Sequence, residues 1–340
     1  MRIAHISDLH INSLIRETHI DMLAFLLKKI EEENYDHLII TGDISDQGEE
    51  RDLLIVRDLL RQKGLLNGKK TTVIIGNHDI FGGLEKLEDI FTFPDRCRNT
   101  DYDEKLRHFR LAFRETFDTC CYVSRNNGYP FAKLVNNVLL IGLNSVPRYA
   151  SLKNPFASRG SIDNQQLIEL KQIVKDYGTD TNAILVLQHH HFSKSGTKKA
   201  RRSENIWGIV ERQTLKLKNK RKIALAMKLA GVSAVFHGHY HESKEYYRYD
   251  LQICNAGGSI KGNKKGQLRY NEITIRGNQI STIVHTLDYV YQCTPEVNLN
   301  DYLETAERNY NRYMELQAIT VSAADKLEIA PGANSSESVR

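Results

Sequence analysis

The sequence lacks the features that mark secreted and membrane proteins. It has five cysteines, an odd number, with no CxxC pair and no regular spacing, so a disulfide framework is not expected. Scattered free cysteines fit a reducing compartment, and we predict a cytoplasmic protein. No apolar run approaches the roughly 20 residues that a membrane-spanning helix needs, so we expect no transmembrane segment. The N-terminal MRIAHISDLHI reaches Asp8 too early for a signal-peptide core, and we expect a buried first strand instead.

Prolines are also few, and the composition of 41% hydrophobic and 26% charged residues is that of a globular protein. Its 340 residues allow one large domain or two smaller ones. The positive net charge comes from residues 194–222, which hold eleven Lys or Arg and two Glu. Two interpretations stay open: a solvated face, or a segment that attracts an anionic substrate, nucleic acid or lipid head group. The second would allow peripheral contact with a membrane.

Along the chain, short apolar runs typical of buried strands alternate with stretches in which apolar residues have the spacing of amphipathic helices. Helical spacing at 17–33 and 49–64 separates three short apolar runs, HISD, HLIITGD and TVIIGNHD. This order predicts a parallel sheet covered by helices. Further along we predict helices at 163–177 (with Asp163 as N-cap), 222–230 and 298–319, and strands at 132–143, 183–188, 232–237 and, as antiparallel strands, 268–290.

Two segments interrupt this rhythm. Residues 81–130 are expected to be a mostly helical insertion, and the basic residues 193–222 a second one. We therefore predict one domain over 1–290, a helical extension over 291–330 and a disordered tail over 331–340.

Polar side chains follow the predicted strands where each strand ends. They are Asp8 and His10 in SDLH, Asp43 in TGD, Asn77 and His78 in GNHD, His189 in QHHH, and His239 and His241 in GHYH. Because the carboxyl ends of parallel strands line one crevice, we expect these side chains to meet. Carboxylate, imidazole and amide oxygen form a ligand set for Zn²⁺, Mn²⁺ or Fe. The sequence therefore predicts a metal centre.

The spacing of these residues suits phosphate chemistry. Asp-x-His and His-x-His place alternate side chains on one side of a strand end. The glycines before Asp43, Asn77 and His239 permit tight turns where a Cβ would collide. One carboxylate can bridge two ions roughly 3.5–4 Å apart, and such a pair clamps the attacking and leaving oxygens of a displacement at phosphorus.

The series DLH, GDxxD, GNHD, a strand-terminal His and GHxH spans residues 1–260 and resembles the calcineurin-like metallophosphoesterase family. The resemblance implies an α/β fold, a four-layer α/β/β/α sandwich of two mixed sheets, and a hydroxide that bridges two metal ions as the nucleophile. It assigns one ion to Asp8, His10, Asp43 and His241, and the other to Asp43, Asn77, His189 and His239. His78 would protonate the leaving oxygen, with Asp46 of GDISD holding its imidazole.

Several histidines leave choices open. His189 is preferred as the ligand because it comes first after the strand, and His190 is the next choice. His5 and His237 lie inside predicted strands and are interpreted as structural. Asp79, which completes GNHD, is expected to support the ligands.

GNHD, the histidine run, NAGGS at 255–259 and RGSIDNQQL at 159–167 resemble the small bacterial phosphodiesterases that hydrolyse cyclic nucleotides and glycerophosphodiesters. A nucleotide or phospholipid-derived phosphate ester is therefore expected, and nucleic acid is not, because 298–340 is too short for the docking regions of the family's nucleases. Trp207 and Ile206 lie among the Lys and Arg of the basic segment, a mixture that suits a lipid-linked diphosphate and a nucleotide equally. One alternative is therefore pyrophosphate cleavage of a lipid-linked nucleotide of the UDP-diacylglucosamine type. The other alternative is a non-catalytic metal-binding scaffold, against which the complete motif set argues.

Overall fold

The computed structural model describes residues 1–84, 89–192, 217–262 and 266–290, together with the single residues 304, 308 and 311. The chain divides into two compact units, Met1–Glu296 and Val297–Arg340. Apart from those three single positions, the predicted helix at 298–319 and the tail at 331–340 lie outside the described residues. Most of the basic segment 194–222 also lies outside them.

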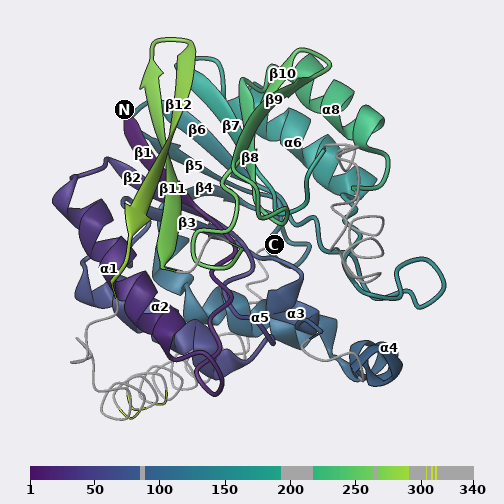
Figure 1. The fold of residues 1–340 in the computed structure, drawn as a ribbon. Helices are drawn as coiled ribbons and strands as arrows, with labels where there is room; N and C mark the ends of the chain where they lie inside the picture. Colours follow the sequence, from purple (N-terminus) through teal and green to yellow (C-terminus); the bar gives the residue numbers. More distant parts are fainter. Residues whose placement is uncertain are drawn as a thin grey trace, which may run out of the picture. The chain divides into compact units, whose positions relative to one another are not determined.

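A five-stranded sheet, in the order β12-β11-β1-β2-β3, carries the first three motifs. Its strands are β1 (Arg2–Ile6), β2 (His37–Thr41), β3 (Thr71–Ile74), β11 (Gln267–Arg276) and β12 (Gln279–Asp288). The first three strands are parallel, as predicted, whereas β11 joins β1 and β12 antiparallel. The sheet is therefore mixed. Helices α1 (Thr18–Glu32) and α2 (Glu50–Gln62) bury apolar faces beside it (Figure 1).

A seven-stranded sheet, in the order β4-β5-β6-β7-β8-β10-β9, carries the other two motifs. Its strands are β4 (Cys120–Val123), β5 (Phe131–Val135), β6 (Val138–Gly142), β7 (Ala183–Leu187), β8 (Ala234–His237), β9 (Lys244–Arg248) and β10 (Leu251–Asn255). Helices α6 (Asn164–Tyr177) and α8 (Lys220–Leu229) share one apolar core with this sheet. As predicted, Asp163 caps α6 by accepting a 2.8 Å hydrogen bond from the Gln166 backbone N–H.

Two mixed sheets with helices beside each make the four-layer α/β/β/α architecture that the motifs led us to expect (Figure 1). The run at 132–143 forms two antiparallel strands, because Asn136 and Asn137 adopt left-handed φ angles of 45° and 63° and turn the chain back. The segment 81–130 is mostly helical, with α4 (Asp89–Asn99) and α5 (Tyr102–Ala112), but it also contributes strand β4.

Strands β9 and β10 were not anticipated from the sequence. Strand β9 reads KEYYR and is largely exposed at the sheet edge, so it carries no apolar signal. Within the described ranges, no helix combines the length and the apolar character that crossing a bilayer requires.

One buried charge makes a testable prediction about stability. Lys133 on β5 is fully buried, and its ammonium donates a 2.8 Å hydrogen bond to the Thr71 carbonyl of β3. Burial lowers the pKa of Lys133 from 10.5 to about 8. The unfolded chain keeps this proton to higher pH, so the contribution of Lys133 to the unfolding free energy should increase from pH 8 to 10.5, by at most about 3 kcal/mol.

The measurement is urea unfolding of the protein and of Lys133→Met at pH 7.5 and at pH 10. Relative to the variant, the protein with Lys133 should gain stability at the higher pH. An identical pH dependence of the two proteins would show that Lys133 does not lose its proton in the folded state.

Candidate metal centre

The loops that follow the strands hold four of the predicted ligands in an unusual backbone conformation. Asp8, His10, Asp43 and His239 have φ angles of 53°, 47°, 51° and 70°. This left-handed region costs non-glycine residues on the order of 1–3 kcal/mol, and such residues gather at functional sites. Their side chains converge on one space at the carboxyl edge of both sheets.

Glycines bring these loops unusually close together. A Cβ on Gly76 would lie 2.2 Å from the Asp43 backbone nitrogen, and a Cβ on Gly238 would lie 1.8 Å from Ser7 Oγ. Gly42 has a φ of +89°, and its Cβ would meet Gly76 at 2.7 Å. The glycines before Asp43, Asn77 and His239 therefore do what the sequence predicted: they allow contacts that no side chain permits.

The first cluster contains Asp8, His10 and His241, whose donor atoms all lie within 4.8 Å of one another. The Nε2 atoms of His10 and His241 face each other at 3.2 Å, and His241 Nε2 lies 3.6 Å from Asp8 Oδ1. Asp43 Oδ2 lies 3.8 Å from His10 Nε2. This convergence of nitrogen and oxygen donors is the arrangement that surrounds a cation.

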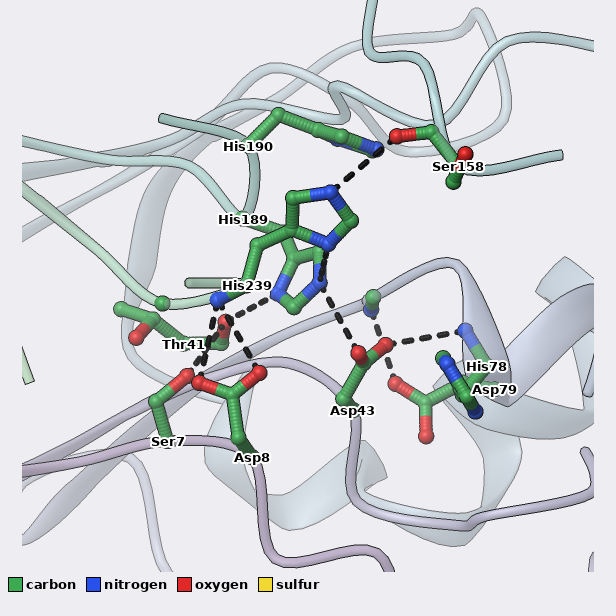
Figure 2. Close-up of polar contacts among 12 residues, drawn as sticks. Ser7, Asp8, Thr41, Asp43, His78, Asp79, Ser158, His189, His190 and His239 are labelled. Carbon is green, nitrogen blue, oxygen red and sulfur yellow. Dashed lines mark hydrogen bonds and ion pairs between the residues drawn. The ribbon is translucent and has the colours of Figure 1, made fainter. Parts of the chain in front are cut away.

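The second cluster contains Asp43, His189 and His239. Figure 2 shows His189 between the other two, with its Nε2 3.1 Å from both Asp43 Oδ2 and His239 Nδ1. Asn77 belongs to the same region, because the next residue, His78, donates its backbone N–H to Asp43 Oδ1 at 2.9 Å. Asp43 thus contacts one histidine from each cluster.

The outward ring nitrogen of three histidines is held by an acceptor. His10 Nδ1 donates to Asp46 Oδ1 at 2.8 Å. Figure 2 shows the other two contacts, in which His189 Nδ1 donates to the Thr41 carbonyl at 2.8 Å and His239 Nε2 donates to the Ser158 carbonyl at 3.1 Å. Carbonyls only accept hydrogen bonds, so the outward nitrogens of His189 and His239 carry the protons. In the neutral rings the inward nitrogens therefore have the lone pairs, which is the state that binds a metal.

The donor set passes two tests of fit to metal ions. Asn77 Oδ1 is buried without a hydrogen-bond partner among the described residues, which leaves a carbonyl oxygen in need of a positive group. Burial lowers the pKa of His189, but the Asp43 carboxylate more than offsets this and raises it to about 9. The site thus draws a proton to a place where a metal ion would supply the positive charge. The two clusters could therefore hold metal ions.

His78 and Asp46 meet in a way the sequence did not predict. His78 Nδ1 donates to the backbone carbonyl of Asp46 at 2.9 Å, whereas the Asp46 carboxylate is 3.8 Å away. That carboxylate instead accepts from His10 at 2.8 Å, from Lys261 at 2.8 Å and from Arg16 at 2.5 Å. Asp46 thus contacts the imidazole of His78 mainly through its main-chain carbonyl, while its carboxylate lies at ion-pair distance.

A third group that comes within 4.8 Å consists of His10, Asp46 and His78. Its only carboxylate already accepts bonds from Lys261 and Arg16. Burial alone would raise the pKa of Asp46, but the His10 bond and the Lys261 charge hold it far below its usual range. Two neighbouring cations make this a poor place for a metal ion.

The remaining histidines lie outside both clusters. His190 Nδ1 bonds Ser145 Oγ at 2.9 Å, so of the two candidates the geometry places His189 in the cluster and His190 behind it. His5 bonds Thr41 Oγ1 at 2.9 Å, and His237 bonds the Tyr246 hydroxyl at 2.8 Å. Both are buried in strands between other side chains.

Asp79 ties two ligand loops together. Its carboxylate accepts 2.8 Å hydrogen bonds from the backbone N–H groups of Ile44, Ser45 and Gly76. These donors flank Asp43 and Asn77, so Asp79 holds the TGD and GNHD loops at a set spacing (Figure 2).

Sequence reasoning missed Arg16, Lys261, Thr41 and Ser158. Thr41 and Ser158 act through backbone carbonyls, for which no residue type is a signal. Arg16 follows DLH and Lys261 follows NAGGS, and neither forms a motif. Their contact with Asp46 exists only in the fold.

Comparison with known proteins agrees with this geometry. The sequence model of the calcineurin-like phosphoesterase family matches residues 1–243. Among solved structures, a dimetal phosphatase from Danio rerio is 12% identical with a TM-score of 0.51, over 85% of this chain and 99% of that one. A purple acid phosphatase from seeds of yellow lupin (Lupinus luteus) is 9% identical with a TM-score of 0.51, over 86% of this chain and 54% of that one.

At such identities these two structures show a shared fold alone. Comparison with curated protein sequences gave no match. The family match covers most of the chain and includes every motif that builds the two clusters. The chain therefore belongs to the calcineurin-like phosphoesterase family and is a hydrolase that acts on phosphoester bonds.

Proposed function

We propose that this hydrolase is a phosphodiesterase that uses two metal ions. Asp8, His10, Asp43 and His241 would hold the first ion, and Asp43, Asn77, His189 and His239 the second. The observation that carries the proposal is the position of Asp43, whose Oδ2 lies 3.8 Å from His10 Nε2 and 3.1 Å from His189 Nε2. One carboxylate is thus placed to serve both clusters.

Imidazole, carboxylate and amide donors without a thiolate favour Mn²⁺, Fe or Zn²⁺. When bound, such ions polarise phosphoryl oxygens and lower the pKa of water. The chain's own part is to hold these donors in place through the backbone strain and the outward hydrogen bonds described above.

His78 is the group we propose as general acid. Its side chain is 20% exposed, and its ring lies edge-on to His10 with 4.5 Å between centroids. Because Nδ1 donates to the Asp46 carbonyl, Nε2 is the atom that would deliver a proton to the leaving oxygen. The carbonyl holds the ring in one orientation, which proton transfer requires.

A diester substrate is favoured by the resemblance of GNHD and NAGGS to small bacterial phosphodiesterases. In the structure, Asn255 of NAGGS donates to the carbonyls of Tyr240 and Glu242, at 2.6 Å and 2.9 Å, and so supports the GHYH loop. Pyrophosphate cleavage of a lipid-linked nucleotide stays the alternative within the same chemistry.

The described cysteines, Cys97, Cys120, Cys121 and Cys254, are unpaired and support a cytoplasmic location.

The test is hydrolysis of bis(p-nitrophenyl) phosphate beside p-nitrophenyl phosphate, with Mn²⁺ added to chelator-stripped protein. We expect metal-dependent cleavage of the diester and little cleavage of the monoester. A preference for the monoester would contradict the phosphodiesterase assignment. Inactivity on both with two ions bound would favour the lipid-linked diphosphate, and inactivity without bound metal would favour a scaffold.

A further inference from the structure

Two cations from distant parts of the chain meet beside the first cluster. Arg16 lies in the loop between β1 and α1, and Lys261 lies in the loop between β10 and β11. Both donate to the carboxylate of Asp46, Arg16 to Oδ2 at 2.5 Å and Lys261 to Oδ1 at 2.8 Å. We propose that Arg16 and Lys261 bind a second phosphoryl group of the substrate, next to the one that is hydrolysed. The inference rests on the proposed function and specifies its substrate class.

The first argument is charge. Asp46 supplies one negative charge, and two cations contact it. Its third partner is the Nδ1 of His10, which donates at 2.8 Å. One positive charge therefore remains over, next to clusters that would gain further positive charge on binding metal ions. An oxyanion is the ligand that such a place attracts.

The second argument is the number of unused donors. Among the described residues, the Lys261 ammonium contacts only Asp46 and, at 3.4 Å, the Nδ1 of His10. The guanidinium of Arg16 uses one N–H on Asp46 and has no other hydrogen-bond partner in the described ranges. The two side chains are 31% and 32% exposed. A guanidinium with its fork open to solvent matches the oxygens of a phosphoryl group.

The third argument is position. The Lys261 ammonium lies on the Nδ1 side of His10, and the Nε2 of the same ring faces His241 at 3.2 Å. One imidazole ring therefore separates Lys261 from the space where the scissile phosphoryl group would bind. His78, the proposed general acid, packs against the same ring.

If the two cations served only to hold Asp46, one would suffice to balance its charge. Arg16 also approaches the carboxylate with a single N–H rather than with its two-pronged edge, which is the weaker way to hold an acid. The pair therefore suits a substrate with two phosphoryl groups, either joined as a diphosphate or separated within a phosphorylated diester.

The experiment measures anion binding by calorimetry to the metal-loaded full-length protein, at constant free Mn²⁺. Inorganic phosphate is compared with pyrophosphate, which tests adjacent phosphoryl groups. Thymidine 5′-monophosphate is compared with thymidine 3′,5′-bisphosphate, which tests separated ones. We expect tighter binding of the doubly phosphorylated ligand than of the singly phosphorylated one in one of the two pairs. Tighter binding of pyrophosphate would identify the second phosphoryl group as part of a diphosphate. Tighter binding of the bisphosphate would identify it as a separate phosphoryl group of a phosphorylated diester.

The variants are Lys261→Met and Arg16→Met, which keep the length of the side chain and remove its charge. Each variant should bind the doubly phosphorylated ligand about tenfold more weakly than the unaltered protein does, whereas its affinity for the singly phosphorylated ligand should fall much less. Lys261→Arg should restore most of the affinity. Lys228→Met is the matched control, because Lys228 also pairs with one carboxylate, Asp250 at 2.5 Å, but on the surface of α8.

The proposal is wrong if neither Met variant changes the ratio between the two ligands of either pair while both ions are retained. It is equally wrong if the variants lose metal and both ligands weaken together, since Arg16 and Lys261 would then act only through Asp46 and His10. The outcome is separable from that of the proposed function, because a protein inactive on the nitrophenyl diester can still show or lack this difference in binding.

Discussion

Asp43→Asn is expected to remove both metal ions and to reduce hydrolysis to the level of metal-free protein. The substitution keeps the shape of the side chain and removes the charge that both clusters share, since Asp43 Oδ2 lies near His10 and near His189. Loss of a residue that merely supports a ligand weakens metal binding roughly 10–100-fold. Loss of a shared carboxylate should weaken it further and at both positions.

The measurement is metal content after dialysis, together with the rate on bis(p-nitrophenyl) phosphate. Asp58→Asn is the matched control, because Asp58 is also a buried carboxylate but bonds Arg61 on α2. It should keep both ions even if stability falls. One ion retained by Asp43→Asn at full affinity would mean that Asp43 serves a single cluster, and the shared-carboxylate assignment would be abandoned.

His78→Ala is expected to lower turnover by about 10²–10⁴ while both ions stay bound. His78 lies outside the two clusters, and its hydrogen bond to Asp43 comes from the backbone N–H, which Ala also has, so of its contacts with the clusters the substitution removes only that of its ring with His10. The loss should grow with the pKa of the leaving alcohol, because a poor leaving group depends more on protonation. A series of aryl phosphodiesters with increasingly basic leaving phenols measures this dependence.

His285→Ala is the control for that series, since His285 is a partly exposed histidine that stacks on Tyr270 and bonds Glu272. Its turnover should match that of the unaltered protein for every ester. If His78→Ala slowed all esters equally, proton donation to the leaving group would not be its role. If it lost an ion, His78 would be a ligand, as the cluster of His10, Asp46 and His78 would require.

The proposed ligands could be located from the sequence because they come in the turns that follow apolar strands. A buried strand and the turn after it are local features, and the pattern of neighbouring residues predicts such features. Asp8, Asn77 and His241 needed only the rule that parallel strand ends meet. The choice between His189 and His190 was harder, since neighbours in a loop can point either way. In the structure Ser145 contacts the ring of His190 and Asp43 contacts the ring of His189, which supports the proposal of His189 as the ligand.

Other features lay beyond the sequence because they arise between distant segments. The family resemblance implied mixed sheets, but no periodicity in either strand predicts that β11 pairs with β1. The contacts of Asp46 are a second example, because its carboxylate accepts from His10 Nδ1 at 2.8 Å while His78 donates to its main-chain carbonyl.

The sequence by itself thus determined the family and the residues able to bind metal, because motif spacing encodes local backbone geometry. The tertiary structure alone decided which ring nitrogens face inward, because backbone carbonyls that carry no sequence signal hold the opposite nitrogens. It also decided that Arg16 and Lys261 meet on Asp46, since only the packing of the β1 and β10 loops brings the two cations within reach of one carboxylate.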